Sequence, residues 1–157
     1  MVNERRSLYP DAEELRVWRD FVETAQALHD ELAARLQQDC SLSPGDYAVL
    51  LALSEAAGRR LRSSDLARTM GWERSRLSHH LGRMERRGLI RRDRCATDSR
   101  GAEVVLTAEG ADAFRAALLP HLRAIREVFV DSLSPERIVA VGDAMAALRA
   151  ARGIHRG

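Results

Sequence analysis

The chain has 157 residues, of which 45% are apolar, 31% charged and 4% aromatic, and its formal net charge is +2. This length can bury a hydrophobic core without disulfide support, and the composition excludes a disordered chain and argues against a β-sandwich. The 25 basic residues are all arginine, a bias that weakens any inference drawn from arginine content alone.

The sequence carries no sign of export or of a membrane anchor. Its first residues lack the apolar stretch of a signal peptide, and no segment approaches the ~20 apolar residues needed to cross a bilayer. Its two cysteines, Cys40 and Cys95, are too few and too far apart to predict a disulfide framework or a zinc cage. We therefore expect a cytoplasmic protein with no membrane partner and no cofactor.

Helical periodicity dominates the first half of the chain, where apolar residues recur at spacings of three and four. Ser43 as N-cap, with Pro44 at the first helical position, predicts the start of a helix. Ser63 or Ser64 is the expected N-cap of a shorter helix, and Gly71 turns the chain into the next one. We expect helices over 11–38, 43–57, 63–70 and 73–87.

The period changes in the second half of the chain. Two extended runs, 89–94 and 102–106, flank a group of turn residues and predict a β-hairpin. Thr107 is the expected N-cap of a helix that continues to about residue 131, and Ser134 is that of a last helix. The predicted fold class is therefore mainly α with one small β-hairpin.

The charge distribution singles out the middle of the chain. Residues 59–100 contain 13 arginines and five acidic residues, a balance of +8, so the rest of the chain carries −6. An arginine bias that acts on the whole chain cannot produce this asymmetry. A mildly acidic body with one strongly basic segment is typical of a protein with a nucleic-acid-binding face.

The basic segment has the spacing of a helix-turn-helix. Ala67, Gly71 and Leu77 supply a small residue at the helix crossing, a residue free to turn, and an apolar anchor for the second helix. That helix would bury Leu81 and Met84 as well, and its basic side would enter the major groove of DNA. The candidate contacts, on its outward side and near its start, are Arg74, Ser75, Arg76, Ser78, His79, His80, Arg83 and Arg87. The alternative is a solvated basic helix without a partner.

The segment "SSDLARTMGWERSRLSHHLGRMERRGLIRRDRCATDSRGAEVVLTAEG" (63–110) resembles the winged helix-turn-helix core of the MarR family of bacterial transcriptional regulators. Its most specific part is "DSRGAEVVLTAEG", an Asp-x-Arg-Gly wing followed by an apolar strand and a Leu-Thr helix start. The helix order outside this core also matches. The resemblance implies one domain over 1–157, with dimerisation helices at 9–39 and 107–157 around a DNA-binding core at 43–106.

The resemblance implies a homodimer that binds a pseudo-palindromic DNA operator and represses nearby genes until a small molecule releases it. In the family the wing arginine enters the minor groove and the wing aspartate orients basic neighbours, roles that would fall to Arg100 and Asp98. The negative potential of a narrow minor groove independently favours an arginine at a hairpin tip. Spare apolar stripes on the terminal helices fit a dimer, although packing within one chain is the alternative.

The effector pocket of the family lies between the dimerisation helices and the winged domain. Trp18, Phe21 and Tyr47 are the candidates for lining such a pocket, with a role in the core as the alternative for each. The effector expected there is a small anionic or phenolic molecule. Whether it would release or activate the protein is open.

Other chemistry has less support in the sequence. Adjacent helical residues point ~100° apart, so His79 and His80 do not form a metal-binding pair, and we expect no metal site. Cys95 lies among arginines that would favour a thiolate, which makes it a candidate redox switch; an incidental exposed cysteine is the alternative. There is no Gly-rich phosphate loop and no nucleophile elbow, so we do not expect an enzyme.

Overall fold

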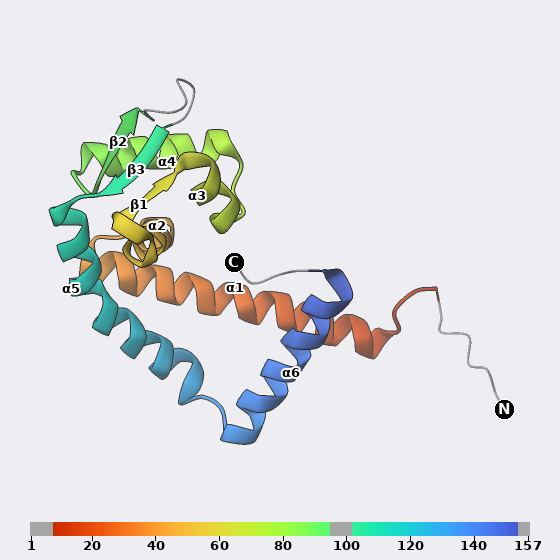
Figure 1. The fold of residues 1–157 in the computed structure, drawn as a ribbon. Helices are drawn as coiled ribbons and strands as arrows, with labels where there is room; N and C mark the ends of the chain where they lie inside the picture. Colours follow the sequence, from red (N-terminus) through yellow and green to blue (C-terminus); the bar gives the residue numbers. More distant parts are fainter. Residues whose placement is uncertain (1–7, 95–101, 154–157) are drawn as a thin grey trace.

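The computed structural model describes residues 8–94 and 102–153, and helices make up most of it (Figure 1). The elements in chain order are α1 (Ala12–Cys40), α2 (Pro44–Glu55), η1 (Ala57–Arg59), β1 (Arg60–Arg62), α3 (Ser63–Met70), α4 (Arg74–Arg86), β2 (Ile90–Arg94), β3 (Ala102–Leu106), α5 (Ala108–Ile125), η2 (Arg126–Val130) and α6 (Pro135–Arg152). The predicted fold class, mainly α with a small antiparallel β-unit, is confirmed.

Side-chain caps determine where the long helices begin. Asp11 accepts a hydrogen bond from the backbone N–H of Glu14, and the Glu14 carboxylate accepts one from the N–H of Asp11. The same reciprocal pair joins Ser43 and Asp46 at the start of α2. These bonds satisfy N–H groups that a helix start leaves without partners. The structure confirms the predicted N-caps Ser43, Thr107 and Ser134.

The sheet has three strands within the described residues, one more than predicted. All pairs are antiparallel and the order is β1-β3-β2. With three residues, β1 is too short for its alternation to be detected. It also changes the start of α3: Arg62 is the N-cap, and the Ser63 hydroxyl donates to the carbonyl oxygen of Ala102 at 3.0 Å. The prediction that Ser63 or Ser64 caps α3 is therefore wrong.

The hydrophobic core lies between α2, the helix-turn-helix, the sheet and the first turns of α5. Leu50, Leu53 and Val104 have no exposed surface. The ring of Phe114 in α5 closes this core, with its centroid 5.4 Å from that of Tyr47. Burial of such a side chain contributes ~1.5–3 kcal/mol, so this part of the chain has a core of its own.

The start of α5 fits closely against the turn between α4 and β2. An added Cβ at Gly110 would lie 1.9 Å from the carbonyl oxygen of Leu89, so only glycine fits there. The Thr107 hydroxyl donates to the carbonyl oxygen of Gly88 at 2.6 Å and accepts from the N–H of Gly110 at 3.0 Å. These contacts fix the direction in which α5 leaves the sheet.

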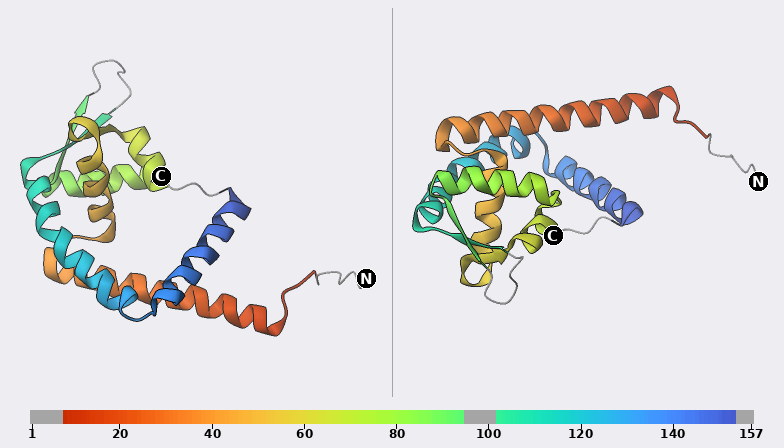
Figure 2. Two further views of the ribbon diagram at one scale, coloured as in Figure 1. Left: turned by 60° about the horizontal axis from the view of Figure 1, so that its bottom comes forward. Right: turned by 90° about the horizontal axis from the view of Figure 1, so that it is seen from above.

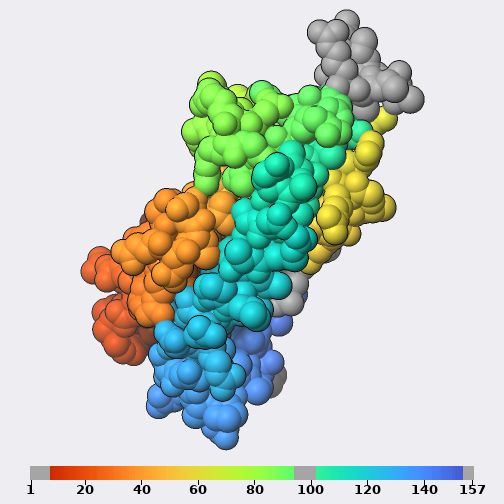
Figure 3. Space-filling model, turned by 90° about the vertical axis from the view of Figure 1, so that its left-hand side faces the viewer, coloured from red at the N-terminus to blue at the C-terminus, as the bar shows by residue number. Residues whose placement is uncertain are grey.

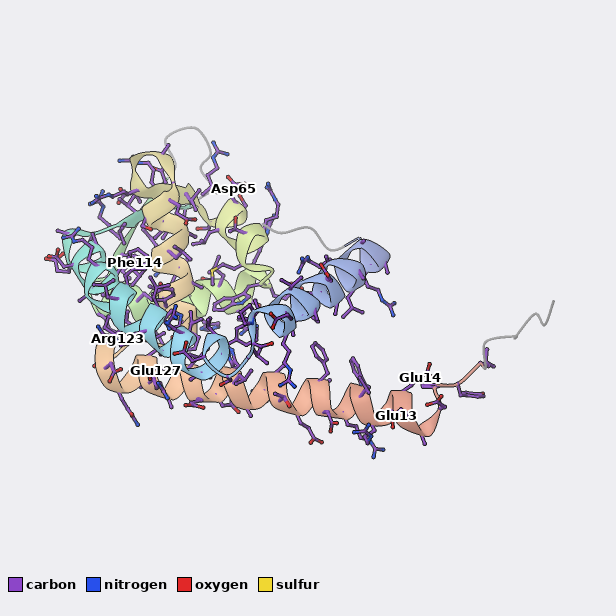
Figure 4. All side chains as sticks on the ribbon, turned by 90° about the horizontal axis from the view of Figure 1, so that it is seen from below. Glu13, Glu14, Asp65, Phe114, Arg123 and Glu127 are labelled. Atoms are coloured by element: carbon purple, nitrogen blue, oxygen red, sulfur yellow. The ribbon has the colours of Figure 1, made fainter. Side chains whose placement is uncertain are left out.

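We call residues 43–94 and 102–106 the winged part, and α1, η2 and α6 the arms. α1 extends far beyond the winged part, whereas α6 starts beyond the far end of α5 and runs back in the direction of the winged part (Figure 1; Figure 2, left). Seen from the side, α5 runs between α4 at one end and η2 at the other (Figure 3). The first turns of α1, with Glu13 and Glu14, lie far from the winged part (Figure 4).

An ion pair joins α1 to η2. Nη1 of Arg35 in α1 lies 2.7 Å from Oε2 of Glu127 in the π-helical turn η2; Glu127 is labelled in Figure 4. In α1 only Leu36, near the winged part, is buried, and in Pro135–Arg152 of α6 no residue is. Most of the apolar surface of the arms therefore remains exposed in one chain.

Candidate nucleic-acid interface

α3 and α4 form the predicted helix-turn-helix. Gly71 ends α3 in the left-handed region, with φ 62°, which glycine adopts without strain. Ala67 in α3 is buried, as are Leu77, Leu81 and Met84 along one side of α4. The expected roles of these residues as turn and anchors are confirmed, so α4 is held firmly on the core by its apolar side.

The opposite side of α4 is strongly basic and exposed, and we call it the basic face. The only acidic residue of α4, Glu85, points to β2, where its Oε2 lies 2.7 Å from the Nη2 of Arg92. The face therefore carries positive charge that no carboxylate of α4 neutralises. Its exposed members are Arg74, Ser75, Arg76, Ser78, His79, Arg83, Arg86 and Arg87.

Arg76 is oriented by an aromatic neighbour in the turn before α4. Its guanidinium carbon lies 4.2 Å from the centroid of the Trp72 indole, the geometry of a cation–π contact. Such a contact limits the directions that a long side chain explores. The contact thus holds Arg76 along the surface of α4 in the free protein.

His80 departs from the prediction. Its side chain is 9% exposed, so the expectation that it lies on the outward side of α4 is wrong. It faces inward because it is three residues after Leu77 and four before Met84, on the same helical face as both. The ring packs edge-on against Trp72, with centroids 5.1 Å apart.

Asp46 of α2 is the buried anion behind the basic face. It is 4% exposed, and its Oδ1 lies 3.0 Å from the Nε2 of His80. Its Oδ2 accepts from the Nη1 of Arg87 at 2.7 Å and from the N–H of Ser43 at 2.9 Å. Burial alone would raise the pKa of Asp46, but these three partners outweigh it and hold that pKa well below the usual range.

Arg87 therefore uses part of its hydrogen-bonding capacity in contacts within the protein. Besides Asp46, its guanidinium donates to the carbonyl oxygen of Ser41, and its side chain remains 42% exposed. It ties the end of α4 to the start of α2. Arg83, in contrast, is exposed and donates from Nη2 to the Nδ1 of His80 at 2.9 Å.

Sequence reasoning missed Trp72 and Asp46 as parts of this site. The signal for Asp46 was the capping pattern Ser43-x-x-Asp46, which explains a helix start but not a partner 41 residues away. For Trp72 a position directly before a basic helix was the only hint. Both residues act through contacts that spacing along the chain does not reveal.

Three predicted residues fall outside the described part of the chain: the wing pair Asp98 and Arg100, and the candidate redox residue Cys95. The described residues of β2 include the pair Arg91 Nε–Asp93 Oδ1 at 2.7 Å. The other cysteine, Cys40, is half-buried, and burial raises the pKa of its thiol, which disfavours the reactive thiolate.

The predicted pocket residues do not come together in one chain. Trp18 and Phe21 are 61% and 43% exposed on α1, where they contact each other, whereas the Tyr47 ring packs on Phe114 and on His121. A pocket of about 420 Å³ does lie between a predicted dimerisation helix and the winged part, among α1, the start of α2 and α4, but other residues line it. It is lined by His29, Ser43, Pro44, Gly45, Trp72, Arg76, His79, His80 and Arg83.

Neither a metal cluster nor a membrane span is found in 8–94 and 102–153. No three His, Cys, Asp or Glu side chains there converge as ligands for an ion. No helix in these residues is long and apolar enough to cross a bilayer.

Comparisons with known proteins agree on one family. A profile described as the MarR family matches residues 41–101. The transcriptional regulator HosA of Escherichia coli O157:H7 is 34% identical over 110 residues, which cover 69% of this chain and 79% of HosA.

Two solved structures from Streptomyces coelicolor are similar over almost the full length. Sco3205, a MarR family transcriptional regulator in complex with DNA, has a TM-score of 0.85 and 36% identity, covering 92% of this chain and 91% of that one. AbsC, another MarR family transcriptional regulator, has a TM-score of 0.83 and 34% identity, covering 94% and 99%. These relatives are transcriptional regulators rather than enzymes. The chain has a helix-turn-helix and a three-stranded sheet, and it is similar to these relatives over most of its length. It therefore belongs to the MarR family of DNA-binding transcriptional regulators.

Proposed function

We propose that this protein is a homodimeric repressor that binds a pseudo-palindromic operator through the basic face of α4. The observation that carries the proposal is the arrangement of that face. Its arginines are exposed on a helix whose apolar side is anchored in the core, and the one carboxylate of α4, Glu85, pairs with Arg92 rather than with them. Arg76, near the start of α4, would reach base edges, and Arg83, about two turns further on, would reach the phosphates. The remaining proposed contacts are Arg74, Ser75, Ser78, His79, Arg87, Asp98 and Arg100.

His80 takes a different place in this proposal from the one its sequence suggested. A side chain that is 9% exposed has too little surface to reach a base edge. We assign it to the support of the basic face rather than to direct DNA contact.

The exposed apolar residues of the arms support the dimer. Trp18 in α1 and Val139 and Leu148 in α6 are 61%, 63% and 51% exposed, and they share the arms with Leu15, Phe21, Val22 and Val141. Several exposed apolar side chains of this size on one chain favour burial against a second copy. In such a dimer the two recognition helices would meet half-sites ~34–36 Å apart.

The pocket beside α4 is the site we propose for a small anionic effector. Arginine, histidine and indole side chains line it, and no carboxylate does. Arg76 and Arg83 belong both to this lining and to the basic face, so a bound anion would withdraw them from DNA. The pocket could therefore couple ligand binding to release of the operator without Trp18, Phe21 or Tyr47.

The test is a mobility-shift titration against the DNA that flanks the protein's own gene, at ~50 and ~200 mM salt, with unrelated DNA of equal length as the control. We expect selective binding that weakens by on the order of 10³ between the two salt concentrations, as for several phosphate contacts in each half-site. Equal affinity for both DNAs, or no binding at low salt, would refute operator recognition by the basic face.

A further inference from the structure

A chain of three polar side chains connects the buried start of α2 to the exposed side of α4. Asp46 Oδ1 lies 3.0 Å from His80 Nε2, and Nδ1 of the same ring lies 2.9 Å from Nη2 of Arg83. The outer end of this chain is a proposed DNA contact, whereas its inner end is 4% exposed. His80 is thus the link between a fixed anion and a side chain that must be aimed.

The two contacts of the imidazole require one protonation state. The guanidinium of Arg83 can only donate, so Nδ1 of His80 must carry a lone pair. The proton of the neutral ring then lies on Nε2, beside the carboxylate of Asp46. Nε2 makes no well-aligned hydrogen bond with that carboxylate, so the contact is mainly electrostatic.

Close packing restricts the position of the His80 ring. Trp72 covers the ring at a centroid distance of 5.1 Å, and a Cβ added at Gly45 would lie 2.9 Å from Cε1 of His80. The charged and titratable groups around it are Asp46 from α2, Arg83 with Arg76 and His79 from α4, and His29 from α1. Arg87 reaches the same surroundings through Asp46.

We propose that Asp46, His80 and Arg83 form a proton-sensitive support that positions Arg83 for DNA, so that protonation of His80 weakens operator binding. A proton on Nδ1 replaces the acceptor of Arg83 by a donor and sets two positive charges against each other at 2.9 Å. Arg83 must then leave its position, while the charged ring is drawn closer to Asp46. The inference rests on the proposed function, because it assumes that Arg83 contacts DNA.

The direction of this effect is opposite to that expected from the other histidines. A proton on exposed His79, or on His29 in the pocket, would add positive charge to this face of the protein and so strengthen DNA binding. Protonation of His80 removes the alignment of Arg83 and weakens it. Holding one long side chain in place is worth about three- to tenfold in affinity.

The experiment measures operator affinity by fluorescence anisotropy from pH 8.0 to 5.5 for the wild type, His80→Gln, Arg83→Ala and His79→Gln, with circular dichroism at each pH to verify folding. We expect the wild type to lose about three- to tenfold at the acid end relative to His80→Gln. Arg83→Ala should lack the same loss, because the support then has nothing to position. His79→Gln should instead show a steeper acid loss than the wild type.

Two further measurements keep the outcome decisive. Nitrogen-15 NMR of the free wild-type protein at pH 7.5 should show His80 with its proton on Nε2; a proton on Nδ1 would overturn the proposal without reference to DNA. If His80→Gln does not fold, the comparison of wild type with Arg83→Ala, whose side chain is exposed, decides. Parallel pH profiles in those two proteins would overturn the support, whereas absence of selective binding at every pH would overturn the proposed function instead.

Discussion

Leu50, Leu53 and Val104 in the winged part have no exposed surface, whereas in the arms Trp18 is 61% exposed and no residue of α6 is buried. The same contrast holds for charge. The winged part contains the buried carboxylate Asp46 with three partners, and the ion pairs of α1 lie on its surface. One region therefore buries its apolar side chains within a single chain, and the other leaves them exposed on the surface proposed above for the dimer.

The largest expected effect comes from comparing two glycines: Gly110 in α5, which packs against the winged part, and Gly142 in α6 of the arms. Gly110→Ala would force a Cβ against the carbonyl oxygen of Leu89 and should lower the free energy of unfolding by about 3 kcal/mol or more. A Cβ added at Gly142 in α6 would meet no atom within 4 Å beyond its own helix backbone and its chain neighbours. Gly142→Ala should therefore raise the free energy of unfolding by less than about 1 kcal/mol. Urea unfolding of both variants measures this, and equal effects would contradict the close fit at Gly110.

A charge in the apolar surface of the arms should act on assembly rather than on folding. Leu148→Asp places a carboxylate in the proposed dimer surface and should weaken self-association about a hundredfold, since an unpaired charge would be buried. Thr69→Asp, at an exposed position of α3, is the matched control and should leave self-association unchanged. Sedimentation equilibrium gives both constants. A wild type that stays monomeric would favour packing of the arms within one chain.

The buried carboxylate should make the stability of the winged part sensitive to acid. The pKa of Asp46 is lowered by folding, so its contribution is complete above the unfolded pKa of ~3.9 and is lost as the pH falls below that value. Asp46→Asn should cost about 2 kcal/mol at pH 7, and the difference should shrink in acid.

Asp65→Asn provides the control for Asp46→Asn. Asp65 forms an exposed pair with Arg68 at 2.8 Å, and such pairs contribute within about 0.5 kcal/mol. Denaturant titrations at pH 7 and pH 3 distinguish the two positions. A pH-independent difference for Asp46→Asn would mean that packing, not charge, is lost.

The smallest expected change concerns recognition alone. Arg76→Ala should reduce discrimination between operator and unrelated DNA by about tenfold, while leaving the fold and the dimer intact. Arg68→Ala, on the exposed side of α3, should alter both affinities to the same small extent. Competition binding with the two DNAs measures the ratio. Equal loss on both DNAs for Arg76→Ala would make Arg76 a phosphate contact.

Much of the fold could be predicted because its signals are local. The caps Ser43, Thr107 and Ser134 act within three residues of themselves, and the turn at Gly71 follows from its own backbone conformation. Strand β1 could not be predicted, because a three-residue strand is defined by its partner β3 rather than by its own pattern.

The site shows the limit of the same reasoning. The sequence placed most of the basic face correctly, since exposure follows from helical period once Leu77, Leu81 and Met84 are inward. His80 also occupies that inward face, but its polarity suggested an outward role. Its buried ring lies beside the distant Asp46, and a pairing across 34 residues leaves no trace in local spacing.

The two tryptophans of the chain fall one in each region, Trp18 on α1 and Trp72 beside the basic face. Because the Trp72 indole lies 5.1 Å from the His80 ring and 4.2 Å from the guanidinium carbon of Arg76, the fluorescence of a Trp18→Phe protein would report changes at the start of the recognition helix. The fluorescence of a Trp72→Phe protein would report the solvent exposure of Trp18, and therefore whether the arms are buried against a second copy. The chain thus contains its own pair of optical probes, one for assembly and one for the state of the recognition helix.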